Sequence, residues 1–474
     1  MNEERMKNNA KIKMNCRYIL NLVGVVVITL IGFLSFGQAD SAVMNQGKRP
    51  NIIFILGDNH NADFMGCAGH SFIKTPGMDR LAREGLMFTN TFNTTSLCSP
   101  SRASILTGTY AHNHGVKNNH ISWTGTRKTF LEYLSEAGYS TAFIGKWHMP
   151  GGLPEMPFLD LYVSYTDHEG QGRYFNCPMI VNGEEVASRK SYITEEVTDY
   201  AIEFMENSVK TPAKDRKPFC IYLAHRPGHP PFQSPKDIRG MYDSQNISKN
   251  LPKQVDEYWF GKTDGNVFQG VMMGSYYDQY RKYCETITAM DRDIVRILDK
   301  VDELGLEDNT LVIYMGDNGM QWGTHGCHGI REPYEESIRL PFIVRAPWLI
   351  RDNSEKCDQI IANVDIAPFL LDIAGVEVPK SMDGKSLKPL LREPDGKFSD
   401  ACLLEFWRYY PENTPSYTGV RTQRYKYVEF EKSRKPWLFD LKKDPKEEEN
   451  IYNTPNGQKE VKRLQAIMKE LKSQ

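Results

Sequence analysis

The segment Cys98–Gly108 brings together residue types suited to binding and attacking an anion. Pro100 fixes one backbone dihedral and disfavours helical geometry in the residue before it, so the chain around Cys98 can be presented in extended form before it folds. A helix that begins near Ser101 would point backbone N–H groups and a positive helix end toward an anion. Arg102 adds a permanent cation whose donor fork fits oxyanions. An isolated cysteine is more often a small buried hydrophobic residue. The neighbouring motifs therefore have to show whether Cys98 has a structural or a chemical role.

Two pairs of oxygen-bearing side chains follow apolar runs that have the composition of buried strands. The carboxyl ends of parallel strands meet at one edge of a sheet, where α/β proteins bind their ligands. A single Asp-Asn pair at a strand end is usually a turn or a helix cap, but two pairs beside the cysteine segment favour a binding site. The two pairs are Asp58 with Asn59, and Asp317 with Asn318.

Basic side chains follow two further apolar runs. Lys146 and His148 follow the first of them. His225 and His229 follow the second. Histidine suits proton transfer because its charge changes near neutral pH. A lone Lys-x-His sequence is usually only a polar loop, so the position after a strand carries the inference.

The elements that must position these motifs alternate between strand and helix along the chain. Short continuous apolar runs are typical of strands buried on both faces, and the later ones come after stretches that are typical of helices. This alternation predicts an α/β fold with a large, mostly parallel sheet. The predicted strands are residues 51–56, 141–144, 219–223, 310–315 and 342–344, and the predicted helices are residues 75–84, 129–137, 195–207 and 276–304.

The region after residue 383 has a different pattern. Short strand-like pieces lead to a charged helix that starts at about Gly457, and the pieces are residues 402–406, 417–421, 425–430 and 437–441. We therefore expect a catalytic domain at residues 48–383 and a smaller C-terminal subdomain at residues 384–474.

The 474-residue chain has an ordinary globular composition, with 40% hydrophobic and 25% charged residues and a formal net charge of −2. A charge so close to zero does not favour nucleic acid as a partner. An anionic ligand would have to be met by a local cluster of basic residues or by a metal ion.

The N-terminus has the order of a secretory signal. Basic residues precede an apolar stretch at residues 18–36 and a small-residue exit at residues 38–42. We expect residues 1–42 to be a signal peptide that is cleaved near Ala42, with export to the periplasm or the cell surface. The stretch approaches the roughly 20 residues of a membrane span, so an uncleaved anchor is the alternative. No later segment is apolar enough to span a membrane.

Several motifs resemble the type I sulfatase family. Cys98–Gly108 resembles its signature, Gly145–His148 its Gly-Lys-Trp-His element, and Gly316–Gly319 its Gly-Asp-Asn-Gly element. The resemblance implies an alkaline-phosphatase-like α/β sandwich with a large mixed, mostly parallel sheet and a small C-terminal antiparallel sheet. It also implies that a formylglycine-generating or anaerobic sulfatase-maturating enzyme oxidises Cys98 to formylglycine. One hydroxyl of the aldehyde hydrate then attacks sulfur, and the other later expels sulfate.

The same resemblance implies roles for the polar residues. A bound Ca²⁺ is expected, because two carboxylate and two amide oxygens suit this cation better than zinc. The family usually has two aspartates in the first pair, so Asn59 is a departure that removes one negative charge. His229 would protonate the leaving alcohol. The implied catalytic residues are Cys98, Arg102, Lys146, His148 and His229, and the implied metal ligands are Asp58, Asn59, Asp317, Asn318 and Cys98.

A second departure concerns the sulfate pocket. Residues 326–337 resemble the stretch that ends in Tyr-Glu-Glu-Ser in many bacterial sulfatases, where a sulfate-binding lysine lies four residues before the tyrosine. That position is Ile330 here, and an isoleucine cannot bind an oxyanion. The charge then has to come from Arg331, from His325 or His328, or from elsewhere. The expected substrate-binding residues are Arg331, His225 and His325.

These features predict an exported sulfatase that hydrolyses a sulfate ester of a sulfated carbohydrate. Aromatic residues such as Trp123 and those at 406–410 could stack on sugar faces. The alternatives are a sulfamidase or a phosphonate or phosphate monoester hydrolase of the same fold, and a catalytically silent protein that binds sulfated glycans. Ile330 is the only feature that favours the silent protein.

Overall fold

The computed structural model describes residues 49–167, 170–247, 276–350, 356–409, 414–431 and 434–473. The predicted signal peptide at residues 1–42 lies outside the described residues. Within the part of the chain that is described, no helix is both long and apolar enough to cross a membrane.

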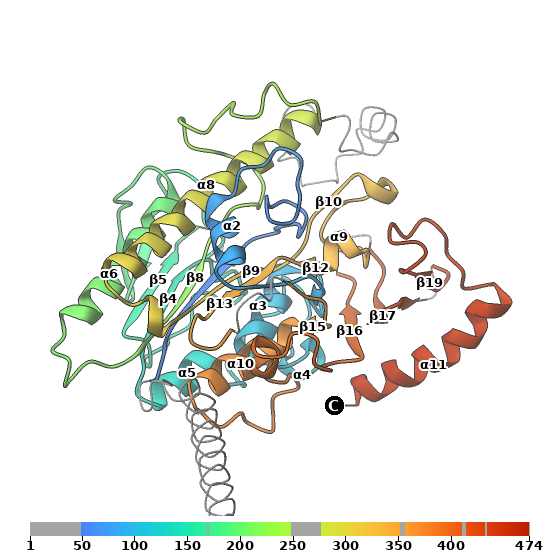
Figure 1. Ribbon diagram of the computed structural model, residues 1–474. Coiled ribbons are helices and arrows are strands. Elements are labelled where there is room, and N and C mark those ends of the chain that lie inside the picture. Colours follow the sequence, from blue (N-terminus) through green and yellow to red (C-terminus); the bar gives the residue numbers. More distant parts are fainter. Residues whose placement is uncertain are drawn as a thin grey trace, which may run out of the picture. The chain divides into compact units, whose positions relative to one another are not determined.

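Ten strands form one mixed sheet (Figure 1). Their order is β14 (Lys356–Cys357), β2 (Leu86–Phe88), β13 (Phe342–Arg345), β9 (Thr310–Gly316), β1 (Asn51–Gly57), β8 (Phe219–Ala224), β4 (Ser140–Gly145), β5 (Leu161–Tyr165), β6 (Met179–Val181) and β7 (Glu184–Val186). The five central strands from β9 to β5 are parallel, whereas β13 and β6 run antiparallel to their neighbours β9 and β5. The expected α/β fold with a large mixed sheet is confirmed.

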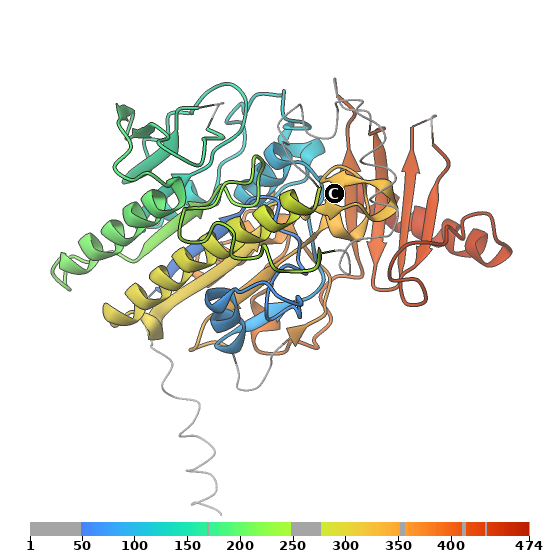
Figure 2. The ribbon, with the colours of Figure 1, turned by 90° about the horizontal axis from the view of Figure 1, so that it is seen from above.

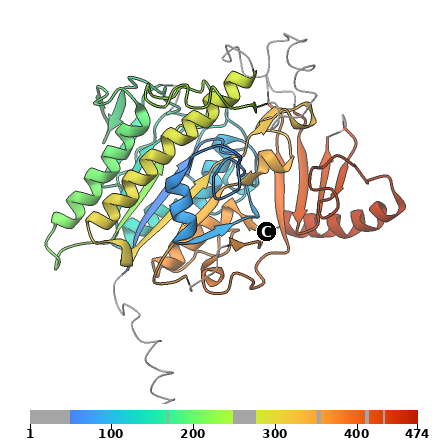
Figure 3. The same cartoon turned by 45° about the horizontal axis from the view of Figure 1, so that its top comes forward.

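Helices cover both faces of this sheet (Figures 1 and 3). Ile53 and Ile55 of β1 pack with the helices of one face, and Ile52 and Phe54 pack with those of the other, because side chains alternate along a strand. The first face carries α2 (Pro76–Arg83), α6 (Ile193–Lys210) and α8 (Tyr276–Glu303), and the second carries α3 (Cys98–Thr107), α5 (Phe130–Glu136) and α10 (Ile366–Ile373).

The predicted helices and strands of this domain are all present, with small shifts at their ends. One start was wrong: the helix expected from near Ser101 begins at Cys98. Pro100 therefore lies in its first turn, where a missing N–H removes no helical hydrogen bond. Shorter elements, which the sequence did not indicate, are β3 (Thr91–Phe92), β12 (Arg339–Leu340) and β15 (Ile361–Ala362) in one small sheet, β10 (Gln321–Trp322) with β11 (His328–Gly329) in another, and the helices α4 (Ala111–His114) and α9 (Glu335–Ile338).

The C-terminal part forms a separate antiparallel sheet, as expected (Figure 2). Its strands are β16 (Ala401–Phe406), β17 (Tyr417–Thr422), β18 (Tyr425–Phe430) and β19 (Trp437–Asp440), and α11 (Pro455–Lys472) packs against β16 and β17. The backbone N–H of Glu405 in β16 donates to the Thr94 carbonyl at 2.8 Å, which links this sheet to the chain just before α3. The domain boundary between residues 383 and 384 stays a prediction.

Candidate active site

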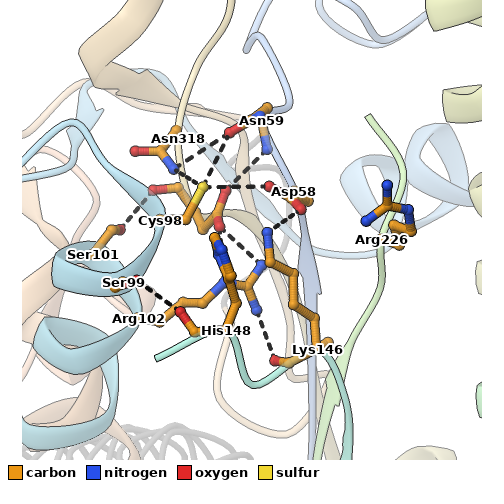
Figure 4. A network of polar contacts seen from close by, with 12 residues as sticks. Asp58, Asn59, Cys98, Ser99, Ser101, Arg102, Lys146, His148, Arg226 and Asn318 are labelled. Carbon is orange, nitrogen blue, oxygen red and sulfur yellow. Dashed lines mark hydrogen bonds and ion pairs between the residues drawn. The ribbon is translucent and has the colours of Figure 1, made fainter. Parts of the chain in front are cut away.

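The carboxyl ends of β1 and β9 bring the two oxygen-bearing pairs together (Figure 4). These strands have equal length, and their last residues pair in register, so Asp58 and Asp317 leave the sheet side by side. The backbone N–H of Asn59 donates to Oδ1 of Asp317 at 2.9 Å. Nδ2 of Asn318 lies 3.4 Å from Oδ1 of Asn59. The structure therefore gathers all four predicted oxygen ligands.

Cys98 opens α3 directly against these pairs. Its Sγ lies 3.8 Å from Oδ1 of Asp58, 3.7 Å from Oδ1 of Asn59 and 3.6 Å from Nδ2 of Asn318. Only 2% of the residue is exposed. Burial raises the pKa of the thiol to about 12, because the charge of Lys146 offsets only part of the desolvation. At neutral pH the side chain is therefore a thiol and not a thiolate nucleophile.

Two buried cations hold the carboxylates. Nζ of Lys146, at the end of β4, donates to the Asp58 carboxylate. Nε and Nη2 of Arg102 lie 3.0 and 2.8 Å from Oδ2 of Asp317. Nη1 of Arg102 also donates to the backbone carbonyl of Lys146 at 3.0 Å. Arg102 thus links the Asp317 side chain to the backbone of Lys146, directly after β4.

The acidic cluster fits a hard divalent cation. One ligand atom from each of Asp58, Cys98 and Asp317 lies within 4.8 Å of the other two. Burial and then the charge of Asp58 raise the pKa of Asp317, so the two carboxylates destabilise each other. A cation between them would relieve this repulsion, and carboxylate and amide oxygens are the donors that Ca²⁺ prefers.

His148 lies beside the start of α3. Its backbone carbonyl accepts a hydrogen bond from the Ser99 hydroxyl at 2.7 Å, and its φ of 49° lies in the left-handed region that histidine seldom adopts. Nδ1 of His148 is buried, and no residue in the described part of the chain forms a hydrogen bond with it. Burial, followed by the charges of Lys146 and His229, lowers its pKa well below the usual value. The neutral ring can therefore accept a proton from a nearby hydroxyl.

His229 is fixed by the loop that carries it. Nδ1 donates to the Pro230 carbonyl at 2.6 Å, and the backbone carbonyl of His229 accepts from the Tyr174 hydroxyl at 2.7 Å. Because Nδ1 carries a proton, Nε2 is the atom that can exchange one with a ligand. Burial, followed by Lys146 and Arg226, lowers the pKa of His229 well below the usual value. A bound anion would raise this pKa again, as a general acid requires.

None of the contacts described for the three predicted substrate-binding residues reaches this cluster. His225 is fully buried, neither of its ring nitrogens has a hydrogen-bond partner among the described residues, and burial lowers its pKa to about 3. The ring of His325 stacks on Tyr334 with centroids 3.9 Å apart. Nε of Arg331 donates to the Tyr409 hydroxyl at 3.3 Å. Their roles toward a substrate stay predictions.

Other residues that support the cluster were missed in the sequence. Nδ2 of Asn93 donates to Oδ1 of Asn318 at 2.9 Å, and Oδ1 of Asn119 accepts from the second backbone N–H of α3 at 3.1 Å. Arg226 lies in the same close-up (Figure 4). Nothing in the local sequence marks Asn93, whereas a cation between two histidines was an available signal for Arg226. Nothing in the sequence marks Asn119.

Two family profiles match the chain. The profile described as "Sulfatase" matches residues 50–376, and the profile described as "N-sulphoglucosamine sulphohydrolase, C-terminal" matches residues 323–474.

Individual proteins are similar over most of the length. N-acetylglucosamine-6-O-sulfatase of Bacteroides thetaiotaomicron is 32% identical, and the match covers 93% of this chain and 89% of that protein. A solved structure in complex with its substrate D-glucosamine-2-N,6-O-disulfate is 30% identical, with a TM-score of 0.78 and coverage of 90% of this chain and 98% of the other. The phosphonate monoester hydrolase of Agrobacterium radiobacter shares the fold, with a TM-score of 0.71 at 22% identity over 89% of this chain and 96% of the other.

Proposed function

Because this chain belongs to the sulfatase family and is a sulfuric ester hydrolase, we propose that it removes sulfate from a sulfated carbohydrate. A 6-O-sulfated glucosamine is the first substrate to test. One similar protein is named as an N-acetylglucosamine-6-O-sulfatase, and one similar structure holds a 6-O-sulfated glucosamine as its substrate. The observation that carries the proposal is the buried cysteine at the start of α3, packed against two carboxylates and beside a lysine and a histidine.

In this proposal, a formylglycine-generating or anaerobic sulfatase-maturating enzyme converts Cys98 to formylglycine. When present, the aldehyde hydrate supplies the hydroxyl that attacks sulfur. The raised pKa of the buried Cys98 thiol is consistent with a nucleophile other than the thiol itself, because a protonated thiol is a poor nucleophile. The 2% exposure of Cys98 leaves a modifying enzyme no access to it in the folded protein, so the conversion precedes folding.

Asp58, Asn59, Asp317 and Asn318 would hold one Ca²⁺, together with the modified side chain at position 98. When bound, the cation offsets the charge of the sulfate group and aligns an oxygen for attack. The mutual repulsion of the two carboxylates supports this ligand set.

The remaining side chains bind the substrate and move protons. Lys146 would hold sulfate oxygens, since its Nζ lies at the carboxylate beside position 98. His148 would accept a proton from a hydroxyl at that position through its open Nδ1. His229 would donate a proton from Nε2 to the leaving alcohol oxygen, so that an alkoxide does not have to leave.

Cleavage of an N–S bond is the second candidate function. The match of residues 323–474 to the C-terminal profile of N-sulphoglucosamine sulphohydrolase favours it. The same site could serve, because protonation of a leaving nitrogen needs the same acid position as protonation of a leaving oxygen.

A substrate panel tests the proposal. Protein made with a maturating enzyme, with its aldehyde content measured by mass spectrometry, is assayed on N-acetylglucosamine 6-sulfate, glucosamine N-sulfate, and phosphate and phosphonate monoesters. We expect sulfate release from the 6-O-ester to be fastest. Release from the sulfamate alone would support the second candidate, and sugar binding without release would support a silent glycan-binding protein. Cys98→Ala is the matched inactive control.

We also propose that the protein is exported to the periplasm or the cell surface with removal of residues 1–42. The sequence of that segment supports this proposal, and N-terminal sequencing of the mature protein tests it.

A further inference from the structure

The position of the family's sulfate-binding lysine carries no charge in this protein. Ile330 is 5% exposed, and its side chain belongs to the apolar core. Its backbone carbonyl accepts a hydrogen bond from the Ser96 hydroxyl, two residues before Cys98. The backbone at this position therefore lies near the start of α3, but another residue has to supply the positive charge.

The basic residues next to Ile330 in sequence do not meet this need. Burial lowers the pKa of His328 to about 3, and burial followed by the charge of Lys426 lowers the pKa of His325. Both rings are therefore neutral at neutral pH. Arg331 is charged, but its Nε and its backbone carbonyl contact Tyr409 and Tyr417 of the C-terminal subdomain, whereas the cation sought here has to lie beside Cys98.

Arg226 is a buried cation in the loop that also carries His229, and it is 4% exposed. Its Nη1 donates to the Gln171 carbonyl at 2.9 Å, and its Nη2 donates to the Pro230 carbonyl at 3.1 Å. Its guanidinium lies 4.9 Å from the ring centroid of Tyr174. Its Nε is buried and has no hydrogen-bond partner among the described residues. The guanidinium is thus held firmly, with donors still available.

No carboxylate neutralises Arg226 among the residues that the structure describes. The other two buried cations of the site, Lys146 and Arg102, are each paired with a carboxylate. In Figure 4, no dashed line joins Arg226 to any other residue drawn there. The pKa of His229 is lowered first by burial, then by the charge of Lys146 and then by the charge of Arg226. The charge of Arg226 therefore acts on the side chain proposed as the acid. A buried charge without a counter-ion is costly, and a bound anion would offset that cost.

We propose that Arg226 binds an oxygen of the scissile sulfate group and so supplies the positive charge that Ile330 does not. The inference rests on the proposed sulfatase function. A guanidinium has five N–H donors in a planar fork, and two backbone carbonyls take two of them. The remaining donors suit an oxyanion, and the two carbonyls already fix the orientation of the fork.

Arg226→Met tests this inference in aldehyde-bearing protein, because methionine removes the charge and keeps an apolar stem. We expect kcat/KM to fall by roughly ten- to a hundredfold, the worth of one charge-assisted hydrogen bond. The loss should be similar for an activated aryl sulfate and for a 6-O-sulfated sugar, because both carry the same sulfate group. Arg226→Lys should retain part of the activity.

Tyr174→Phe is the matched control for the His229 loop. It removes the hydroxyl that donates to the His229 carbonyl and leaves the guanidinium in place. A displaced His229 would slow the sugar ester, whose alcohol needs a proton to leave, and would spare the aryl sulfate. If Arg226→Met showed this selective pattern, Arg226 would act only through the loop and the inference would be overturned.

Binding without turnover provides a second readout. In the Cys98→Ala background, calorimetry compares the sulfated sugar with its desulfated form, and thermal melting monitors the fold. Arg226→Met should weaken binding of the sulfated sugar and leave the desulfated sugar unchanged. If Arg226→Met lost the same amount of affinity for the sulfated and the desulfated sugar, the inference would be overturned. If Arg226→Met does not fold, Arg226→Gln, which can still donate to one carbonyl, takes its place.

The proposed function and the role of Arg226 can be refuted separately. No sulfate release from any ester by aldehyde-bearing wild type would refute the proposed function. An active wild type and an equally active Arg226→Met would refute only the role of Arg226.

Discussion

Cys98 faces two carboxylates in a buried cluster, and its pKa of about 12 keeps the thiol protonated at neutral pH. We expect active protein to carry an aldehyde at this position, which mass spectrometry of the tryptic peptide would show as a mass below that of the thiol. Cys98→Ser should be inactive when it is made in a host that modifies only cysteine. Full turnover by protein with an intact thiol would contradict this mechanism.

Asp317 is one of the two acidic residues of the predicted metal site, and its loss would also leave Arg102 without an ion pair. We expect Asp317→Ala to reduce calcium affinity by roughly tenfold or more, a loss seen even for residues that only support a metal ligand. Activity should fall with it, and chelation should have the same effect on the wild type. Calcium titration calorimetry is the measurement, with the exposed Asp215→Ala as control. Normal calcium binding by Asp317→Ala would remove it from the site.

Arg331 contacts the C-terminal subdomain through Tyr409, whose ring also lies against His120 with centroids 5.2 Å apart. We expect Arg331→Ala to lower kcat/KM for sulfated sugars more than for a small aryl sulfate, because Arg331 contacts the ring-bearing Tyr409 and aromatic rings can stack on sugar faces. Steady-state kinetics on both substrates measure the difference. A uniform loss would instead place Arg331 on the sulfate group, as one reading of the sequence predicted.

At the level of elements, apolar runs were enough to locate β1, β4, β8, β9 and β13, and helical patterns located α2, α5, α6 and α8; the central strand β5 was missed. The runs also placed the acidic pairs, Lys146 and His229 at strand ends, which is why much of the site could be predicted. Strand direction could not be read in the same way. An apolar run such as that of β13 has the same composition whether its neighbour is parallel or antiparallel, and β13 is antiparallel to β9.

Sequence analysis also did not identify the residues that support the site, and the reason is physical. Asn93 and Arg226 gain their importance from neighbours that are distant in sequence, such as Asn318 and Gln171. Local patterns carry no information on such contacts. The start of α3 was predicted three residues too late. A proline only disfavours helical geometry in the residue before it, and tertiary packing overrides that preference at Ser99.

The helix α9 explains part of the Tyr-Glu-Glu-Ser motif as a structural link. Glu335 pairs with Arg421 at 3.0 Å and with Lys426 at 3.3 Å, so α9 is joined to β17 and β18. Burial would raise the pKa of Glu335, but the charges of Arg421 and Lys426 outweigh it and hold the pKa at about 2.

Glu335→Gln should therefore lower the free energy of unfolding by about 3–5 kcal/mol at pH 7, the usual result of removing one partner of a buried ion pair. The depressed pKa means that the stabilisation is present above the unfolded value of 4.5 and is lost as pH falls toward 2. The difference between wild type and variant should narrow over that range. Urea unfolding at a series of pH values measures it, and a pH-independent difference would show that the pair is not its source.

For the molecule as a whole, the C-terminal sheet depends on the α/β part for a counter-ion. Arg421 of β17 is 5% exposed, and its carboxylate partner Glu335 lies before the predicted boundary at residue 384. We expect residues 384–474 expressed alone to be unfolded, because the fragment would lose the ion pairs that Glu335 makes with Arg421 and Lys426. Circular dichroism of the fragment, with the full mature chain as control, is the measurement. A cooperative melting transition of the fragment would show that the subdomain folds independently.

The central strands that carry the site are neighbours in space but far apart in the chain. The hydrogen bond between Asn59 and Asp317 joins residues 258 positions apart, and half of the predicted metal oxygens come from each side of that gap. A chain that ends before residue 317 would therefore keep Asp58 and Asn59 but lack Asp317 and Asn318. The predicted metal site can form only after β9 and the two residues that follow it have been synthesised and β9 has paired with β1.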